Sequence, residues 1–135
     1  MGKLLSYKDL IVWQKAKALA IAVYELTEQF PKSEIYGITS QMRRCSISIP
    51  SNIAEGRRRE SRKDFCQFVR IAYGSGAELE TQIEIVKELS LGKNIDFKKV
   101  DGLLQEVMKM LNTMSSSLQA NSNNWLTEVL NINWN

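Results

Sequence analysis

Apolar side chains recur every three or four residues in the first part of the chain, which is the spacing of one face of an α-helix. Ser6 and Asp9 have the spacing of a capping box and would open this helix. Pro31 disfavours helical geometry at the residue before it, so the helix should end before Phe30. The apolar face is wide enough to predict more than one neighbouring element. Its members are Leu10, Ile11, Trp13, Ala16, Leu19, Ala20, Ala22, Val23, Leu26, Thr27 and Phe30.

A second amphipathic helix is predicted from residue 34 to Gly56. Glu34 would lie at the positive end of the helix dipole, and Gly56 suits the glycine position at a helix C-terminus. Pro50 lacks a backbone N–H and clashes with the carbonyl four residues before it, so we predict a kink at Ile49 rather than a new helix. The predicted buried face consists of Ile35, Ile38, Met42, Cys45 and Ile49.

The longest predicted helix begins after Ser61, which forms a second capping box with Asp64, and a fourth helix begins after Asp96. Gly74 and Gly76 lie inside the third helix, where each costs about 1 kcal/mol relative to alanine, so we expect a neighbouring helix to pack against bare backbone. Both helices have seams with alternating steps of three and four. The seams are Phe65, Val69, Ala72, Gly76, Leu79, Ile83, Val86 and Ser90, and then Val100, Leu104, Val107, Leu111, Met114 and Leu118.

Four amphipathic helices with short connections and no strand pattern predict an all-α fold, namely an antiparallel up-down four-helix bundle with a kinked second helix. The bundle should occupy residues 1–118. Residues 119–135 differ from it because they are rich in asparagine, although Trp125, Val129 and Ile132 could form one helical face. This C-terminal tail is expected to be either a short docking helix or a partner-binding segment.

The chain contains no histidine, which excludes several classes of chemistry. A Ser-His or Cys-His dyad, an imidazole zinc site and the Glu-x-x-His pairs of di-iron bundles all need this residue. We therefore expect no enzymatic activity, no cofactor and no bound metal. Glu80, Glu84 and Glu88 share a helix face that we interpret as solvated surface, and a hydrolase using this face or Glu55 is the weaker alternative.

The two cysteines, Cys45 and Cys66, lie in apolar surroundings without metal-ligand spacing, so we expect reduced, buried thiols. The sequence has no apolar run of about 18 residues and no pattern of a secretory signal. These features predict a soluble, cytoplasmic protein that makes no membrane contact.

All seven arginines lie between residues 43 and 70, although the net charge is only +3. Guanidinium groups suit phosphate, and the predicted turn after Gly56 would bring residues 57–63 to one end of the bundle. We predict a nucleic-acid site that contacts phosphates without base-specific readout. A solvated basic turn, or pairing with acids of a neighbouring subunit, are the alternatives. The candidate residues are Arg43, Arg44, Arg57, Arg58, Arg59, Arg62, Lys63 and Arg70.

Several motifs together resemble the bacterial four-helix bundle proteins, which are also called 23S ribosomal RNA intervening-sequence proteins. The resemblance extends over about residues 7–118, and the segment from Ser48 to Gly56 is its most specific part. The other motifs are Val12-Trp13-Gln14, Tyr24, Phe30-Pro31, Tyr36-Gly37-Ile38-Thr39-Ser40-Gln41-Met42-Arg43-Arg44 and Ala72-Tyr73-Gly74-Ser75.

The resemblance implies a four-helix bundle that assembles into a homo-oligomer, a cyclic pentamer. Relatives include the accessory variability protein of diversity-generating retroelements, which binds nucleic acid and a reverse transcriptase. Other members are encoded in intervening sequences of ribosomal RNA genes and have no established function. By position, the basic residues would bind nucleic acid, whereas Ser51, Asn52 and Glu55 would shape the kink or a subunit contact.

Two functions therefore stand ahead of the hydrolase. The first is a non-catalytic, oligomeric accessory protein that binds RNA or DNA and assists a reverse transcriptase. The second is an oligomeric scaffold that binds protein through its C-terminal tail.

Overall fold

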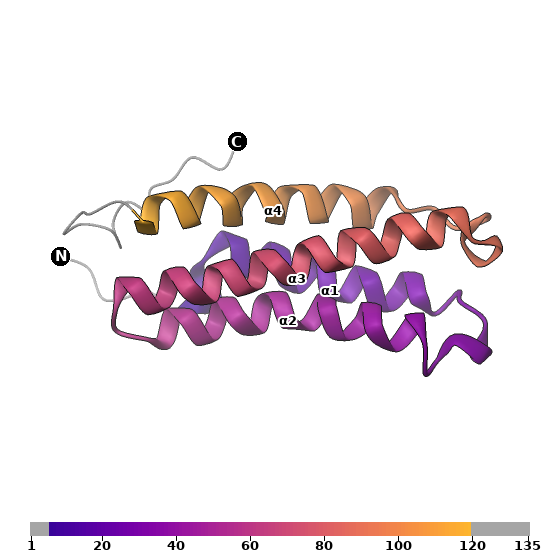
Figure 1. Ribbon diagram of the computed structural model, residues 1–135, viewed down its shortest axis with the longest axis horizontal. Coiled ribbons are helices and arrows are strands. Elements are labelled where there is room, and N and C mark those ends of the chain that lie inside the picture. The colour runs from indigo at the N-terminus through magenta and orange to yellow at the C-terminus, as the bar shows by residue number, and fades with distance from the viewer. Residues whose placement is uncertain (1–5, 120–135) are drawn as a thin grey trace.

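The computed structural model describes residues 6–119, and this part of the chain contains four long helices and no strand (Figure 1). The predicted all-α, four-helix fold is therefore confirmed. The predicted C-terminal tail lies, from residue 120 onward, outside the described residues. The α-helices are α1 (Ile11–Thr27), α2 (Ile38–Arg58), α3 (Arg62–Glu88) and α4 (Lys98–Gln119), and the short 3-10 helices are η1 (Tyr7–Asp9), η2 (Lys32–Glu34) and η3 (Ser90–Gly92).

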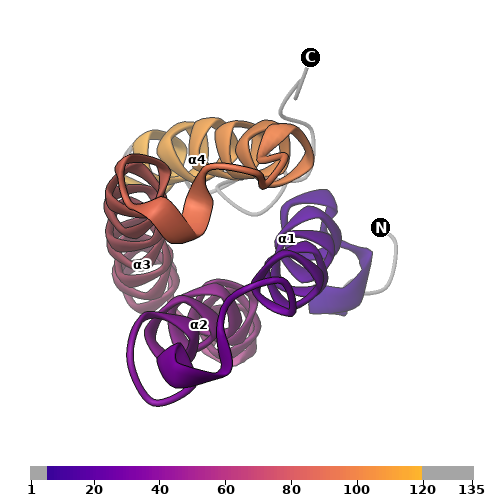
Figure 2. The same ribbon diagram turned by 90° about the vertical axis from the view of Figure 1, so that its right-hand side faces the viewer.

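The four helices form a ring when viewed along the bundle, and each packs against its two neighbours in that ring (Figure 2). The guanidinium of Arg58, in the last turn of α2, lies over the ring of Tyr7, which precedes α1. Lys99, at the start of α4, forms an ion pair of 3.8 Å with Glu25, near the end of α1. Each contact joins the start of one helix to the end of its neighbour, so adjacent helices run in opposite directions (Figure 1).

The predicted seams of α3 and α4 face the interior of the ring. Every predicted α4 seam residue is buried, and so is every α3 seam residue except Ser90, which is exposed in η3. Leu19 of α1 and Met42 of α2 are fully buried in the same core. Burying a side chain of this size contributes about 1.5–3 kcal/mol, so apolar burial is the main force that holds the bundle together.

The start of α2 differs from the prediction. The helix begins at Ile38 with Gly37 as its N-cap, because the residues after Pro31 form η2 and a turn instead. Ile35, predicted to be buried, is 49% exposed, and Tyr36 is 96% exposed. The apolar spacing was right from Ile38 onward, but the turn chemistry of Pro31 and Gly37 determines where the helix starts.

Gly56 also has a different role from the one predicted. It is buried inside α2, which continues to Arg58, and it does not end the helix. A Cβ added at Gly56 would lie only 2.6 Å from the Cβ of Phe68 on α3. Glycine is required here because α2 and α3 approach each other closely, not because the backbone has an unusual conformation.

α2 continues without interruption through Pro50. The alternative of a second helix restarting after this proline is therefore wrong, and the kink at Ile49 stays a prediction. Asn52 supplies extra polar contacts in this region, since its Nδ2 donates to the carbonyl oxygen of Ser48 at 2.8 Å and to the Ser48 hydroxyl at 3.0 Å. The Ser48 hydroxyl in turn lies 2.8 Å from that of Ser75 on α3, which joins the two helices.

The predicted capping residues and glycine contacts are confirmed in part. Ser6 and Asp9 do form a capping box, but it opens η1, and α1 begins two residues later. Ser61 caps α3 by accepting the Asp64 N–H at 3.0 Å. Gly76 packs against Met108 of α4 as expected, whereas Gly74 faces open space.

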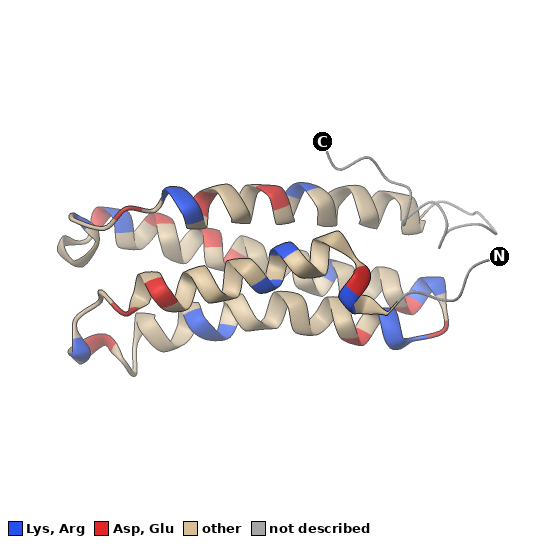
Figure 3. Ribbon diagram, turned by 180° about the vertical axis from the view of Figure 1, so that it is seen from behind, with Lys and Arg blue, Asp and Glu red and all other residues tan. Residues whose placement is uncertain are grey.

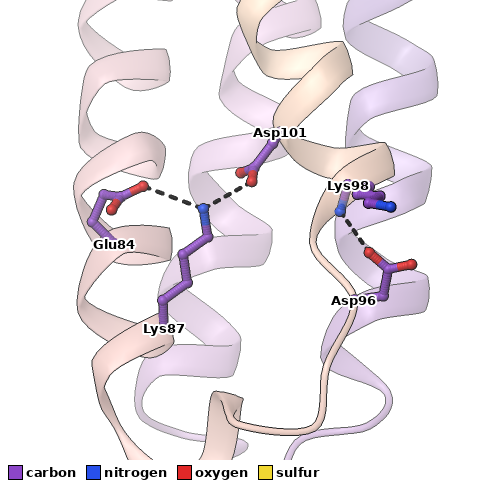
Figure 4. Close-up of polar contacts among 5 residues, drawn as sticks. All are labelled: Glu84, Lys87, Asp96, Lys98 and Asp101. Carbon is purple, nitrogen blue, oxygen red and sulfur yellow. Dashed lines mark hydrogen bonds and ion pairs between the residues drawn. The ribbon is translucent and has the colours of Figure 1, made fainter.

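A polar cluster joins the end of α3 to the start of α4 (Figure 4). Lys87 Nζ lies 2.8 Å from Asp101 Oδ2 on α4 and 3.4 Å from Glu84 Oε1 on its own helix. The hydrogen bond to Asp101 raises the pKa of Lys87 above its usual value. Asp96, the predicted cap of the fourth helix, accepts the Lys98 N–H at 2.9 Å.

Both cysteines are free thiols and buried, as the sequence predicted. Burial and the nearby carboxylate of Glu78 raise the pKa of the Cys45 thiol to about 11. A thiol in this environment stays protonated and unreactive at neutral pH.

Candidate nucleic-acid interface

The turn between α2 and α3 brings a group of cationic side chains to one end of the bundle. α2 ends at Arg58 and α3 begins at Arg62, so a connection of only three residues separates the two helices. Residues 55–64 carry five cations and three carboxylates, and Figure 3 shows acidic positions among the basic ones at this end. We refer to Arg57, Arg58, Arg59, Arg62 and Lys63 together as the basic end.

Aromatic rings lie beneath two of these guanidinium groups. The guanidinium of Arg58 is 5.9 Å from the centre of the Tyr7 ring, and that of Arg59 is 5.2 Å from the centre of the Phe68 ring. Arg59 also forms an exposed ion pair with Glu55 at 2.7 Å. A ring beneath a guanidinium limits its motion and leaves the edge N–H groups available to an anion.

Arg62 and Arg70 interact instead with the C-terminus of α4. Arg62 Nη1 donates to the carbonyl oxygen of Leu118, and Arg70 Nε lies 3.1 Å from the Gln119 amide oxygen when that amide is turned toward it. The last turn of α4 has no basic residue of its own. Two arginines of α3 therefore supply positive charge where the dipole of α4 is negative.

These contacts surround a shallow pocket of about 490 Å³ on the α3–α4 side of the basic end. Arg62, Lys63 and Arg70 line it together with Cys66 and Gln67 of α3. Lys63 is exposed, and among residues 6–119 its flexible ammonium forms no ion pair. The pocket offers cationic groups on one wall and no carboxylate.

Arg43 and Arg44 do not lie with the other candidates. They are fourteen residues before Arg57 and Arg58 on the same helix, which corresponds to about 20 Å along its axis. Arg43 Nε donates to the Thr27 hydroxyl at 2.8 Å, and the guanidinium lies 4.7 Å from the centre of the Tyr24 ring. Arg43 thus links α1 to α2, while Arg44 is exposed.

The sequence alone did not associate Tyr7 with the arginines. The two are about fifty residues apart, and only the antiparallel path of the chain brings η1 beside the end of α2. The predicted topology could have indicated that Tyr7 lies near these arginines, because an up-down bundle places the start of its first helix next to the end of its second helix. Phe65 is fully buried and Phe68 half-buried, as expected for a pair of which at least one belongs to the core.

A second surface feature is an open groove of about 890 Å³ between α1 and α2. We call it the α1–α2 groove. Its walls include Trp13 and Ile21 of α1 and Ile47 and Pro50 of α2, and the two isoleucines are about half exposed. Trp13 and Ala20 belong to the wide apolar face predicted for the first helix and gave a partial sequence signal for this surface, whereas Ile21 was not among the predicted positions.

Neither a metal centre nor a membrane span is found among residues 6–119. This part of the chain contains no cluster of three or more potential metal-ligating residues, and none of its helices is long and apolar enough to cross a bilayer.

The fold and the basic end define the class of this protein as a four-helix bundle with a cationic turn. The sequence model of a protein family described as "23S rRNA-intervening sequence protein" matches residues 8–113, which is most of the chain. The chain therefore belongs to the 23S rRNA-intervening sequence protein family, as the motifs had indicated. A comparison with curated proteins gives no significant match.

Proposed function

We propose that this protein is a non-catalytic accessory protein that binds the phosphate backbone of RNA or DNA through its basic end. The observation that carries the proposal is the concentration of Arg57, Arg58, Arg59, Arg62 and Lys63 at a single turn. Arg58 and Arg59 lie over aromatic rings, and Lys63 is exposed beside a cationic pocket. Such an arrangement favours an extended polyanion over a single small anion.

The carboxylates at the same end weaken the field without cancelling it. Residues 55–64 keep an excess of two positive charges, and Glu55 is already paired with Arg59. We expect moderate affinity with strong salt dependence, and no preference for base sequence.

The proposal includes assembly into a homo-oligomer, which the family resemblance suggests is a pentamer. The exposed surface of α3 supports it, because Ile71 and Ile85 are 45% and 50% exposed and lie about four helical turns apart on the same side of the helix. Several copies in a ring would present several basic ends to one nucleic-acid strand, and such multivalency raises the overall affinity.

A protein-binding scaffold is the second candidate function, and these exposed apolar residues favour it too. A reverse transcriptase is the partner that the resemblance suggests for either function. The two functions differ in what the basic end does, since a scaffold would not need it to bind phosphate.

The test is fluorescence anisotropy of the full chain with labelled single-stranded RNA, duplex DNA and an RNA–DNA hybrid over a salt series. The variant Arg58→Gln/Arg59→Gln/Lys63→Gln should weaken binding at least tenfold and reduce the slope of log K against log [salt] by about 2, because each lost phosphate contact contributes about 0.7–0.9 to that slope. Circular dichroism should show unchanged helix content, since exposed ion pairs contribute little to stability.

The matched control is Lys93→Gln/Lys98→Gln/Lys99→Gln, which removes the same charge from the opposite end of the bundle. Its binding should stay within about twofold of the unmodified protein, because only local phosphate contacts contribute to the salt slope. Equal losses in both variants would mean that the overall charge, and not the basic end, binds the nucleic acid. No binding by the unmodified chain at low salt would leave the scaffold function.

A further inference from the structure

The α1–α2 groove is an apolar surface that nothing covers among residues 6–119. Trp13, Ala20, Ile21 and Tyr24 of α1 form one wall, and Ile47 and Pro50 of α2 are part of the other. Ile21 is 50% exposed and Ile47 is 45% exposed. Contiguous exposed apolar surface of this kind marks a docking site, and a groove between two helices fits a third, amphipathic helix.

The end of this same chain has the pattern that such a groove accepts. Trp125, Val129 and Ile132 are spaced at i, i+4 and i+7, which are the anchor positions of a helix that binds in a groove. Residues 120–124 carry no apolar side chain larger than alanine and have the composition of a spacer.

The lengths also agree. α1 lines the groove from Trp13 to Tyr24, about 16 Å along the helix axis, and residues 125–134 would form a helix of about 15 Å. α4 ends at Gln119, at the same end of the bundle as Tyr7. Residues 120–124 reach at most about 17 Å when extended, which is about two helix-to-helix spacings and enough to pass α1.

The point of entry sets the direction of the docked segment, and the charges set its register along α1. Glu128 is the only charged side chain of residues 120–135, and Lys17 lies on the groove with its ammonium 5.6 Å from the centre of the Trp13 ring. A segment that enters at the Tyr7 end runs in the same direction as α1. Glu128 follows Trp125 by three residues and Lys17 follows Trp13 by four, so the two charges would meet when the two tryptophans are side by side.

We propose that residues 125–134 bind in the α1–α2 groove of their own chain as a short helix, with Trp125 beside Trp13 and with Val129 and Ile132 facing Ile21 and Ile47. This proposal concerns a different surface from the basic end and stands independently of the proposed function. The docked segment adds a fifth α-helix to the fold and covers the exposed side of α1.

The first test is zero-length carbodiimide cross-linking of the full chain followed by peptide mass spectrometry. The expected product joins Glu128 to Lys17 within a chain that still runs as a single subunit on a denaturing gel. The same link found only in species of twice that mass would overturn the proposal, because it would show that the segment binds a second copy. Absence of any Glu128 link to a lysine of α1 would overturn it as well.

The second test is hydrogen–deuterium exchange of residues 125–134 in full-length variants. Ile47→Asp should raise the exchange rate of these amides at least tenfold, whereas the matched variant Ile85→Asp, a half-exposed isoleucine of α3, should leave it unchanged. Equal effects of the two variants, or full exchange in the unmodified protein, would contradict the proposal.

A charge exchange provides a milder variant, because it replaces one charged residue of the groove with another and leaves the apolar residues of the groove unchanged. Lys17→Glu should increase exchange of the same amides, and Lys17→Glu/Glu128→Lys should restore their protection. Failure of the double variant to restore protection would exclude the proposed register.

Discussion

At the scale of single residues, three glycines of the bundle have three different environments. A Cβ at Gly56 would meet the Cβ of Phe68 at 2.6 Å, a Cβ at Gly76 would meet the flexible sulfur of Met108, and a Cβ at Gly74 would meet nothing within 4 Å. The sequence predicted that these glycines lie inside helices, where glycine lowers helix stability relative to alanine. It did not indicate which of them packs against a neighbouring helix. That distinction depends on the distance between helix axes, which no local pattern encodes.

Gly56→Ala should destabilise the protein by about 1–3 kcal/mol, because the new methyl group overlaps a Cβ that cannot move without its backbone. Gly74→Ala is the matched control and should stabilise it by about 0.5–1 kcal/mol, since alanine is the better helix former at an open position. Urea unfolding followed by circular dichroism measures both. A neutral Gly56→Ala would mean that α2 and α3 can separate freely.

At the scale of elements, the helix interiors were predictable and their starts were less so. The seams of α3 and α4 followed directly from their three-four spacing, because a ring of four helices buries one stripe of each. The start of α2 was placed too early because Pro31 and Gly37 impose a turn on a segment whose apolar residues still have helical spacing. For the candidate site, the turn near Gly56 was predictable from the sequence. The distance between Arg43 and this turn depends on whether the helix continues through Pro50, and the structure shows that it does.

The ion pairs of Lys87 link α3 to α4 and should make stability depend on pH in the alkaline range. Because the hydrogen bond to Asp101 raises the pKa of Lys87 in the folded protein above its usual 10.5, the charged form stabilises the fold below that value. This contribution is lost as the pH rises through the higher, folded-state pKa.

Lys87→Met should therefore show a smaller loss of unfolding free energy between about pH 10 and pH 12 than the unmodified protein does. The exposed Lys109→Met is the matched control and should keep the full loss. The measurement is urea unfolding at several pH values. Identical curves for Lys87→Met and the unmodified protein would show that the contact with Asp101 is too weakly populated to matter.

At the scale of the whole molecule, the apolar outer face of α3 bears on assembly. Ile71 and Ile85 are about half exposed on a surface that no other described element covers. If copies associate through this face, Ile71→Glu/Ile85→Glu should reduce the mass measured by light scattering from that of the oligomer to that of the 15.4 kDa chain. Ile35→Glu, at an equally exposed site in the connection before α2, should leave the mass unchanged. A constant mass in both variants would place the subunit contact elsewhere.

The up-down path of the chain has a practical consequence for work on this protein. Ser6 and Gln119, where the described part of the chain begins and ends, both lie at the end of the bundle that carries the α2–α3 turn (Figure 1). An affinity tag or fluorescent protein joined directly at either residue would be held close to the cationic turn and would block a bound strand. The connection before α2 is at the opposite end, where Tyr36 is almost fully exposed. A small dye on a cysteine introduced at Tyr36 would report on binding without covering the surface that binds.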